Sequence, residues 1–188
     1  HIDTIFTMIK RDSWVVYAPF TKDAITLSKE EVDFRRMLDD EMETPEEQVY
    51  VTQFIREKKV DGFKVKVKEF DFLDDLLADV SKGDFGCEKV NIIPNGGAKF
   101  PFTEREQWTD SCNFLAIREG VIIGYDRNTY TNTTLKNRGF NILRAEDFNA
   151  QMEAGAKLED LIKGDTLITL PSAELSRARG GTHCMSMP

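Results

Sequence analysis

Apolar and polar residues alternate with two different periods along the chain, and the two periods predict a mixture of strands and helices. A period of two, which is typical of half-buried strands, covers residues 3–9 and 13–17, so we expect a hairpin that turns at 10–12. The same alternation sets valines against lysines over 63–70 and predicts a half-exposed strand. Other strands are expected over 90–93, 112–117, 121–125, 140–143 and 166–170.

Helix signals occupy the stretches between these strands. Residues 27–59 are acidic and helix-favouring, and Ser28 and Thr44-Pro45 each have the features of a helix start. We therefore expect two helices there, the second with a buried stripe over 49–55. Further helices are expected over 71–81, 132–137 and 146–163. The alternation predicts an α/β fold, in which a strand-strand-helix-strand unit occurs twice.

Composition is that of an ordinary globular protein, with 188 residues, 40% of them hydrophobic and 31% charged. The formal net charge of -8 argues against nucleic acid and anionic membranes as partners. The sequence contains neither an apolar run of membrane-spanning length nor a signal-peptide pattern, and we expect a cytoplasmic protein. The chain starts with His1 at the edge of a strand pattern, which suggests a fragment.

Three cysteines, Cys87, Cys112 and Cys184, lack paired spacing, which favours free thiols in a reducing compartment over a disulfide framework. Cys184 is preceded by two arginines, a glycine pair and His183. Cationic neighbours favour the thiolate, the reactive form of cysteine, so Cys184 is a candidate nucleophile. The alternative is an ordinary buried thiol, and this is what we expect of Cys87 and Cys112.

His1 and Asp3 are two residues apart at the other end of the chain. On a strand these side chains share a face, where an imidazole can move protons and a carboxylate can hold a cation. A cysteine with a distant histidine and acid is the general pattern of thiol-based covalent catalysis. A metal site built from His1, Asp3, His183 and Cys184 is less favoured, because the set mixes hard and soft ligands; we expect neither metal nor cofactor.

Four segments together resemble the C-terminal part of microbial arginine deiminases. They are the segments 1–6, 104–108, 124–133 and 174–185. We expect 104–108 to be a structural loop and 125–133 to supply hairpin and helix-cap contacts. Compared with typical relatives, about 26–61 and 144–164 look longer, and we interpret them as peripheral helical insertions.

The resemblance implies roles for individual residues. Cys184 would attack the guanidinium carbon of L-arginine, releasing ammonia and leaving a covalent intermediate that water hydrolyses to citrulline. His1 would be the proton shuttle and Asp3 one of two aspartates that clamp the guanidinium, while Arg179 would recognise or gate the substrate from a mobile loop. His183 is either a helper or a loop neighbour. Ala178 stands where close relatives have glycine, which puts the backbone contact to the substrate amine in doubt.

The implied fold is a pseudo-fivefold α/β propeller of strand-strand-helix-strand modules, of which residues 1–188 would be the C-terminal portion of the catalytic domain. Full-length relatives would be roughly twice this length. The missing N-terminal part, a partner of this one, would supply the second aspartate, so we expect the piece alone to be inactive. A homo-oligomer is a further expectation. Two alternatives stay open: a related guanidine-modifying enzyme such as an agmatine deiminase or an amidinotransferase, and a non-catalytic association module.

Overall fold

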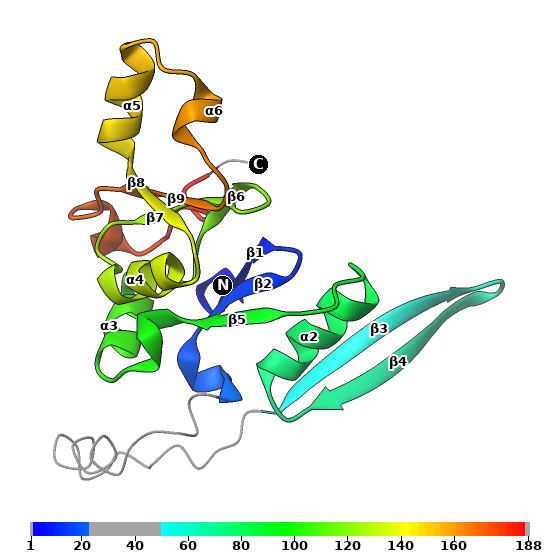
Figure 1. The fold of residues 1–188 in the computed structure, drawn as a ribbon. Coiled ribbons are helices and arrows are strands. Elements are labelled where there is room, and N and C mark those ends of the chain that lie inside the picture. Colours follow the sequence, from blue (N-terminus) through cyan, green and yellow to red (C-terminus); the bar gives the residue numbers. More distant parts are fainter. Residues whose placement is uncertain (1, 23–49, 187–188) are drawn as a thin grey trace, which may run out of the picture.

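The computed structural model describes residues 2–22 and 50–186 as a mixed α/β protein, which confirms the expected class (Figure 1). The first sheet has the strand order β1-β2-β5. Strands β1 (Phe6–Lys10) and β2 (Ser13–Val16) form the antiparallel hairpin that the alternation predicts, and β5 (Asn91–Pro94) runs parallel to β2. Short 3-10 turns precede and follow the hairpin at Ile2–Thr4 and Ala18–Phe20.

The second sheet has the order β6-β7-β9-β8. Strands β6 (Leu115–Arg118) and β7 (Val121–Tyr125) form a second antiparallel hairpin, as expected. Strand β9 (Thr166–Leu170) runs parallel to both β7 and β8 (Asn141–Arg144). Both sheets therefore combine an antiparallel hairpin with a parallel strand that follows a helix, which agrees with the repeated unit inferred from the sequence.

The helices lie between the strands along the chain. They are α2 (Leu73–Gly83), α3 (Phe102–Trp108), α4 (Thr129–Asn137), α5 (Ala145–Glu153) and α6 (Leu158–Leu161), with 3-10 turns at Asn95–Ala98 and Leu175–Ala178. Helices α5 and α6 contain no buried residue, and Figure 1 shows them at the end of the molecule opposite the β3–β4 hairpin. They split the single helix expected over 146–163, because Gly155, with φ of 89°, ends the first of them.

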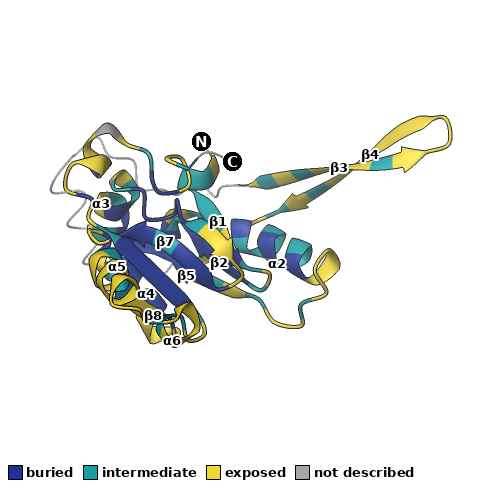
Figure 2. Cartoon of the chain, turned by 90° about the horizontal axis from the view of Figure 1, so that it is seen from above, coloured by how far each residue is buried: buried dark blue, intermediate teal, exposed yellow. Residues whose placement is uncertain are grey.

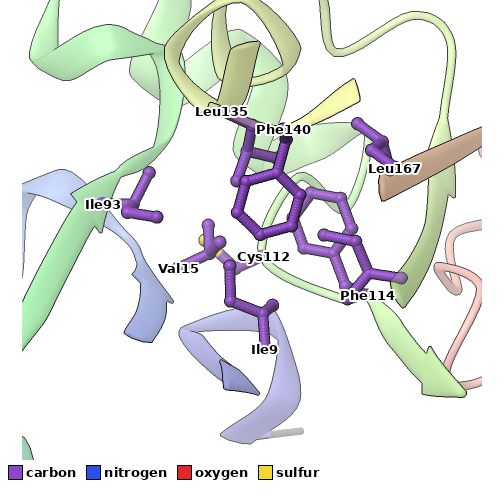
Figure 3. Close-up of a cluster of buried hydrophobic side chains, with 9 residues drawn as sticks. Ile9, Val15, Ile93, Cys112, Phe114, Leu135, Phe140 and Leu167 are labelled. Atoms are coloured by element: carbon purple, nitrogen blue, oxygen red, sulfur yellow. The ribbon is translucent and has the colours of Figure 1, made fainter. Parts of the chain in front are cut away.

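The main core lies between the two sheets and α4 (Figure 3). Its buried side chains are Ile9, Val15, Ile93, Cys112, Phe114, Ile122, Leu135, Phe140 and Leu167. The alternation of β2 sends Val15 into this core and Trp14 and Val16 to the opposite face, where they pack with Leu73 and Leu77 of α2. The first sheet is thus buried on both faces.

Polar contacts join the same two sheets at one edge. The Gly120 N–H donates to the Ile9 carbonyl over 3.0 Å, and Lys10 Nζ lies 3.0 Å from Asp165 Oδ2. The Thr7 hydroxyl donates to the carbonyl of Cys112. The first two contacts hold β1 against the second sheet, and the third holds β1 against the loop that carries residues 110–114.

A long hairpin of β3 (Val51–Lys59) and β4 (Gly62–Phe70) extends away from the two sheets (Figures 1 and 2). The strand over 63–70 is confirmed, but the helix expected to end near 59 is wrong over 51–59. The β-branched and aromatic residues of this segment pair with β4 across a two-residue turn, and this cross-strand pairing outweighs the helical pattern. The helix starts expected at Ser28 and Thr44 lie outside the described residues.

Two other expectations are corrected. Asp3 lies in the 3-10 turn Ile2–Thr4 rather than on a strand. Residues 104–108 belong to helix α3 rather than to a loop, although their role is structural: the buried carboxylate of Glu106 accepts the backbone N–H groups of Tyr130 and Thr131 and so caps α4. Among the described residues, none of the helices has the length and apolar character needed to cross a membrane.

Candidate functional site

The two ends of the chain meet at one carboxylate. Asp3 Oδ2 lies 3.3 Å from Cys184 Sγ and 3.1 Å from His183 Nδ1. The three side chains are separated by about the whole length of the sequence, so only the tertiary fold brings them together. Asp3 is half-buried, whereas His183 and Cys184 are exposed.

Backbone contacts hold each end in place. Near the start, the Ile5 N–H donates to the Ile2 carbonyl within the 3-10 turn, and the Tyr17 N–H donates to the Ile5 carbonyl, which ties the turn to β2. Near the end, the Thr182 hydroxyl donates to the Ile123 carbonyl over 2.7 Å and accepts the Leu115 N–H. The tail is therefore fastened to the β6–β7 hairpin two residues before the thiol.

Asn113 lies between the two ends, just before β6. Its side-chain amide contacts Asp3, His183 and Cys184 at once, with distances from 3.0 to 3.3 Å. The residue is 1% exposed, and its neighbours Cys112 and Phe114 belong to the main core. The site is thus attached directly to the close-packed main core.

A pocket of about 400 Å³ opens beside the thiol. It is lined by Thr4, Asp110, Arg179, Gly180 and Cys184. Asp110 Oδ2 accepts the Gly180 N–H over 3.0 Å, and the other oxygen of this carboxylate is buried without a hydrogen-bond partner. The pocket therefore presents a thiol, a carboxylate and a guanidinium to whatever enters it.

Arg179 has an unusual backbone, with φ of 62° and ψ of 163°, a combination that residues with a side chain rarely adopt. Its guanidinium carbon lies 4.6 Å from the centre of the Trp108 ring, and the Trp108 side chain is exposed. A guanidinium over an indole face is a favourable cation-π arrangement. The Trp108 ring of α3 therefore supports the side chain of Arg179, which lines the pocket together with Asp110.

The contacts within the site shift the pKa values of its two acidic groups in opposite directions, lowering that of Asp3 and raising that of Cys184. Desolvation alone would raise the pKa of Asp3, but hydrogen bonds from His183, Cys184 and Asn113 together hold that pKa below its ordinary value. Desolvation raises the pKa of Cys184, and the neighbouring Asp3 carboxylate raises it further, while Asn113 acts in the opposite direction. The expectation that the arginines favour the thiolate is therefore wrong, since Arg179 lies over Trp108 and Arg177 pairs with Glu174.

The residues predicted from the sequence fall into three groups. Asp3, His183 and Cys184 are in contact, and Arg179 lines the adjoining pocket. His1 lies outside the described residues. Cys112 is fully buried, and burial raises its pKa, as expected of an inert thiol, whereas Cys87 is only half-buried. Within residues 2–22 and 50–186, no group of three or more His, Cys, Asp or Glu side chains is arranged to hold a metal ion.

Sequence reasoning missed Asn113 and Asp110. The only available signal was the run Asp110-Ser111-Cys112-Asn113, in which polar residues crowd around a cysteine directly before a strand. A polar residue in such a place is usually a local turn contact, and its reach across the fold cannot be inferred from its neighbours in sequence.

An α/β protein that gathers a thiol, a carboxylate and an imidazole beside a pocket fits the class of enzymes that use cysteine as a nucleophile. The family model "Arginine deiminase" matches residues 1–188, and the chain therefore belongs to the arginine deiminase family. Similar curated proteins are arginine deiminases of Staphylococcus haemolyticus (28% identical), Streptococcus sanguinis (30%) and Streptococcus pneumoniae (31%). Each similarity covers 100% of this chain.

The same comparisons show how much of the relatives this chain spans. It covers 33% of the Staphylococcus haemolyticus protein and 32% of each streptococcal one. The chain therefore spans only about a third of each of these relatives. A chain that spans about a third of its relatives carries only part of the groups that those proteins contain.

Proposed function

We propose that the complete protein hydrolyses L-arginine to L-citrulline and ammonia, and that this chain carries its nucleophile, Cys184, and one group that holds the guanidinium, Asp3. The observation that carries the proposal is the 3.3 Å distance between Cys184 Sγ and Asp3 Oδ2, in a chain matched throughout by the arginine deiminase family. A carboxylate so close to a sulfur can accept N–H groups of a guanidinium while the sulfur faces its carbon.

In the proposed reaction, Cys184 Sγ forms a bond to the guanidinium carbon and the bond from that carbon to a terminal nitrogen breaks. The nitrogen takes up a proton and leaves as ammonia, so a thiouronium group remains on the cysteine. Water then adds to the same carbon, the carbon–sulfur bond breaks, and citrulline is released with the thiol restored. His1 would supply the first proton and accept one from water, and His183, which contacts Asp3, would help to orient that carboxylate.

Because the pKa of Cys184 is raised, we expect the bound substrate itself to promote ionisation of the thiol. The Asp3 carboxylate is one of the causes that raise this pKa. A guanidinium bound against Asp3 brings a positive charge beside the sulfur, and an adjacent cation favours the thiolate. The thiol would therefore stay protonated until a cationic substrate binds and would ionise on that binding.

Arg179 supports arginine as the substrate over its decarboxylated analogue agmatine. Its guanidinium lies at the pocket that Cys184 also lines, and a planar fork of N–H donors suits a carboxylate. Arginine carries a carboxylate at the end away from its guanidinium, and agmatine does not. We therefore expect Arg179 to contribute to specificity, and a substitution such as Arg179→Lys to raise KM for arginine.

We further infer that the two sheets are modules of the α/β propeller expected for the family, and that the chain is a C-terminal portion of the catalytic domain. The support is their shared plan of an antiparallel hairpin followed by a parallel strand. The remainder of the protein would provide the second carboxylate for the guanidinium. By itself the chain would then bind arginine weakly and turn it over at a negligible rate.

A second candidate function is a non-catalytic association module, which would pair copies of this chain in a homo-oligomer. The observation in its favour is the hairpin β3–β4, where Phe54, Phe63, Val65 and Val67 are 71%, 58%, 56% and 51% exposed. Exposed apolar side chains of this kind mark surfaces that contact other chains. The site geometry carries more weight, because association alone does not require a thiol beside a carboxylate.

The test is citrulline formation by the full-length protein that contains this sequence, with arginine and agmatine compared as substrates. We expect turnover of arginine, loss of that turnover in Cys184→Ala, and retention in Cys87→Ser, which removes a half-buried thiol outside the site. Acid-quenched enzyme should carry an adduct on Cys184 with the mass of arginine minus ammonia. Full activity in Cys184→Ala would refute the proposal, and a folded full-length protein without any turnover would favour the association module.

A further inference from the structure

Every hydrogen-bonding position of the Asn113 side chain is used within the site. The amide nitrogen Nδ2 donates to Cys184 Sγ over 3.2 Å and to the Asp3 carbonyl over 3.3 Å. The amide oxygen Oδ1 accepts the backbone N–H groups of His183, over 3.1 Å, and of Cys184, over 3.0 Å. An asparagine amide has two N–H donors and two acceptor positions, so all four are satisfied.

The orientation of this amide follows from its partners. The two backbone N–H groups can only donate, so the group that faces them must be the oxygen. The nitrogen is then the group that faces the sulfur, and it reaches the sulfur as a donor. A donor directed at sulfur stabilises the thiolate more than the thiol, because a hydrogen bond to an ionised acceptor is the stronger one.

We propose that Asn113 is a positioning residue of the thiol site: it holds Cys184 Sγ at a fixed distance from Asp3 and stabilises the thiolate through its side-chain N–H. The effect on the thiol stands on the geometry of this chain alone. The effect on turnover rests on the proposed function, because it requires that Cys184 be the nucleophile.

Glycine at position 181 fits this role. A methyl group in the place of its α-hydrogen would lie 2.5 Å from Asn113 Cβ and 2.5 Å from Asn113 Oδ1, closer than two such atoms can approach. Gly181 lacks the positive φ that Gly180 has, so the close approach of Asn113, rather than backbone conformation, accounts for glycine here. One glycine of the pair therefore leaves the space that Asn113 fills.

The backbone of Asn113 strengthens the same connection. Its carbonyl lies 3.1 Å from the Thr182 hydroxyl, as the longer branch of a hydrogen bond that this hydroxyl also makes to the Ile123 carbonyl, and the N–H of Asn113 donates to the Asp110 carbonyl over 3.0 Å. The first contact fixes the tail beside the side chain of Asn113, and the second fixes Asn113 beside a residue that lines the pocket. Residues 3, 110 and 182–184 thus share one support.

The decisive measurement is the pKa of the Cys184 thiol, obtained from the rate of alkylation by iodoacetamide as a function of pH. It uses the 188-residue chain in a Cys87→Ser background, in which Cys112 is buried and Cys184 is exposed. Asn113→Leu removes the donor to sulfur at nearly constant volume, and Asn113→Asp removes the donor but keeps an acceptor for the two backbone N–H groups. We expect the thiol pKa to rise by about 1 unit in both, which lowers alkylation at neutral pH about tenfold.

Asn95 provides the matched control. It is 0% exposed and makes three side-chain hydrogen bonds, since it accepts the Ala18 N–H and donates to the Thr103 carbonyl and the Ser111 hydroxyl. Asn95→Leu should lower thermal stability without changing the thiol pKa. If Asn95→Leu raises the pKa as much as Asn113→Leu does, the effect is a general loosening of the fold and the proposal is wrong.

A second variant tests the same proposal while keeping Asn113 itself unchanged. Gly181→Ala should displace the amide from the sulfur and raise the thiol pKa in the same direction, whereas Gly83→Ala, at a helical glycine with nothing within 4 Å of the added methyl, should leave it unchanged. A folded Gly181→Ala protein with an unaltered thiol pKa would overturn the proposal, even if the Asn113 variants do not fold.

Turnover by the full-length protein separates this inference from the proposed function. There Asn113→Asp should lower kcat by about tenfold or more and leave KM nearly unchanged, because the amide contacts the sulfur and its backbone. If the protein makes no citrulline but the thiol pKa responds to Asn113, the proposed function fails and the positioning role stands. If turnover is normal in Asn113→Leu, the positioning role fails and the proposed function stands.

Discussion

The thiol site and the β3–β4 hairpin are two opposite ways of joining segments of the chain. In the hairpin, Lys59 pairs with Gly62 across a two-residue turn, and the partners come from neighbouring parts of the sequence. In the site, Asp3 meets Cys184 and Asn113 contacts both, although these residues are far apart along the chain. Local pairing can form from the alternation of residues alone, whereas the site requires that both sheets and the core already be in place.

The two regions also differ in what surrounds them. Asn113 is 1% exposed and is flanked by residues of the main core, while the valines and phenylalanines on one face of the hairpin are more than half exposed. Figure 2 shows this contrast, with buried residues concentrated in central strands such as β7 and exposed ones along the hairpin. A change in the hairpin should therefore affect little else, and a change near the site should affect both stability and chemistry.

The largest expected difference is between two phenylalanines. The substitution Phe114→Ala should lower the free energy of unfolding by about 3–5 kcal/mol, because Phe114 is only 1% exposed and its removal leaves a cavity between the sheets. Phe54, at 71% exposed on the hairpin, should change stability by no more than about 0.5 kcal/mol. Urea unfolding of the 188-residue chain measures both, and equal losses would show that the hairpin is part of the cooperative core.

A smaller effect is expected at the carboxylate that joins the two ends. Asp3→Asn keeps the size of the side chain but removes the charge that would face a guanidinium, so kcat/KM of the full-length protein for arginine should fall about 10²–10³-fold. The matched control is Asp12→Asn, in the turn of the β1–β2 hairpin, which should retain activity. Similar losses in both variants would place the effect on folding rather than on the site.

The effect of Asp3→Asn on stability should depend on pH. The pKa of Asp3 is lowered from its ordinary value of 3.8, so its contribution to stability is present above pH 3.8 and is lost as the pH falls through the folded-state pKa. Asp3→Asn should accordingly be less stable than the parent chain at pH 7, with a difference that disappears in acid. A difference that persists at pH 2 would contradict this linkage.

The smallest effect concerns the ion pair between the sheets. Lys10 Nζ is 3.0 Å from Asp165 Oδ2, and the hydrogen bond to this carboxylate raises the pKa of Lys10 above 10.5. Because the folded-state pKa is raised, the contribution is fully present below about pH 10.5 and is lost as the pH rises through the folded-state value. Lys10→Met should cost about 0.2–1 kcal/mol at pH 7 and less at pH 11, whereas Lys64→Met, at an exposed position of β4, should cost nothing measurable.

Sequence reasoning was most successful where the period of the pattern is also the geometry of the element. The alternation over 63–70, the hairpin 6–16 and the strands at β7 and β9 are confirmed because side chains of a strand must alternate between its faces. The same reasoning was wrong for 51–59, where strand pairing overrode a helical pattern, and for Asp3, where a 3-10 turn replaced the expected strand. For 51–59 the pairing with the next strand, β4, decided the local structure, and for Asp3 the structure was decided by the turn closed between Ile5 and Ile2.

The sequence by itself therefore determined the class of fold, most of its strands and the residue types at both ends that point to thiol chemistry. Only the tertiary structure decided that His183 and Cys184 both contact the same carboxylate oxygen of Asp3. It also decided that Arg179 lies over Trp108 and that Asn113 connects the two ends of the chain. The physical reason is how far apart along the sequence the interacting residues are. Periodicity records which face of an element is buried, but a hydrogen bond between residues more than 100 positions apart depends on how whole sheets pack, and a single side chain carries no record of that packing.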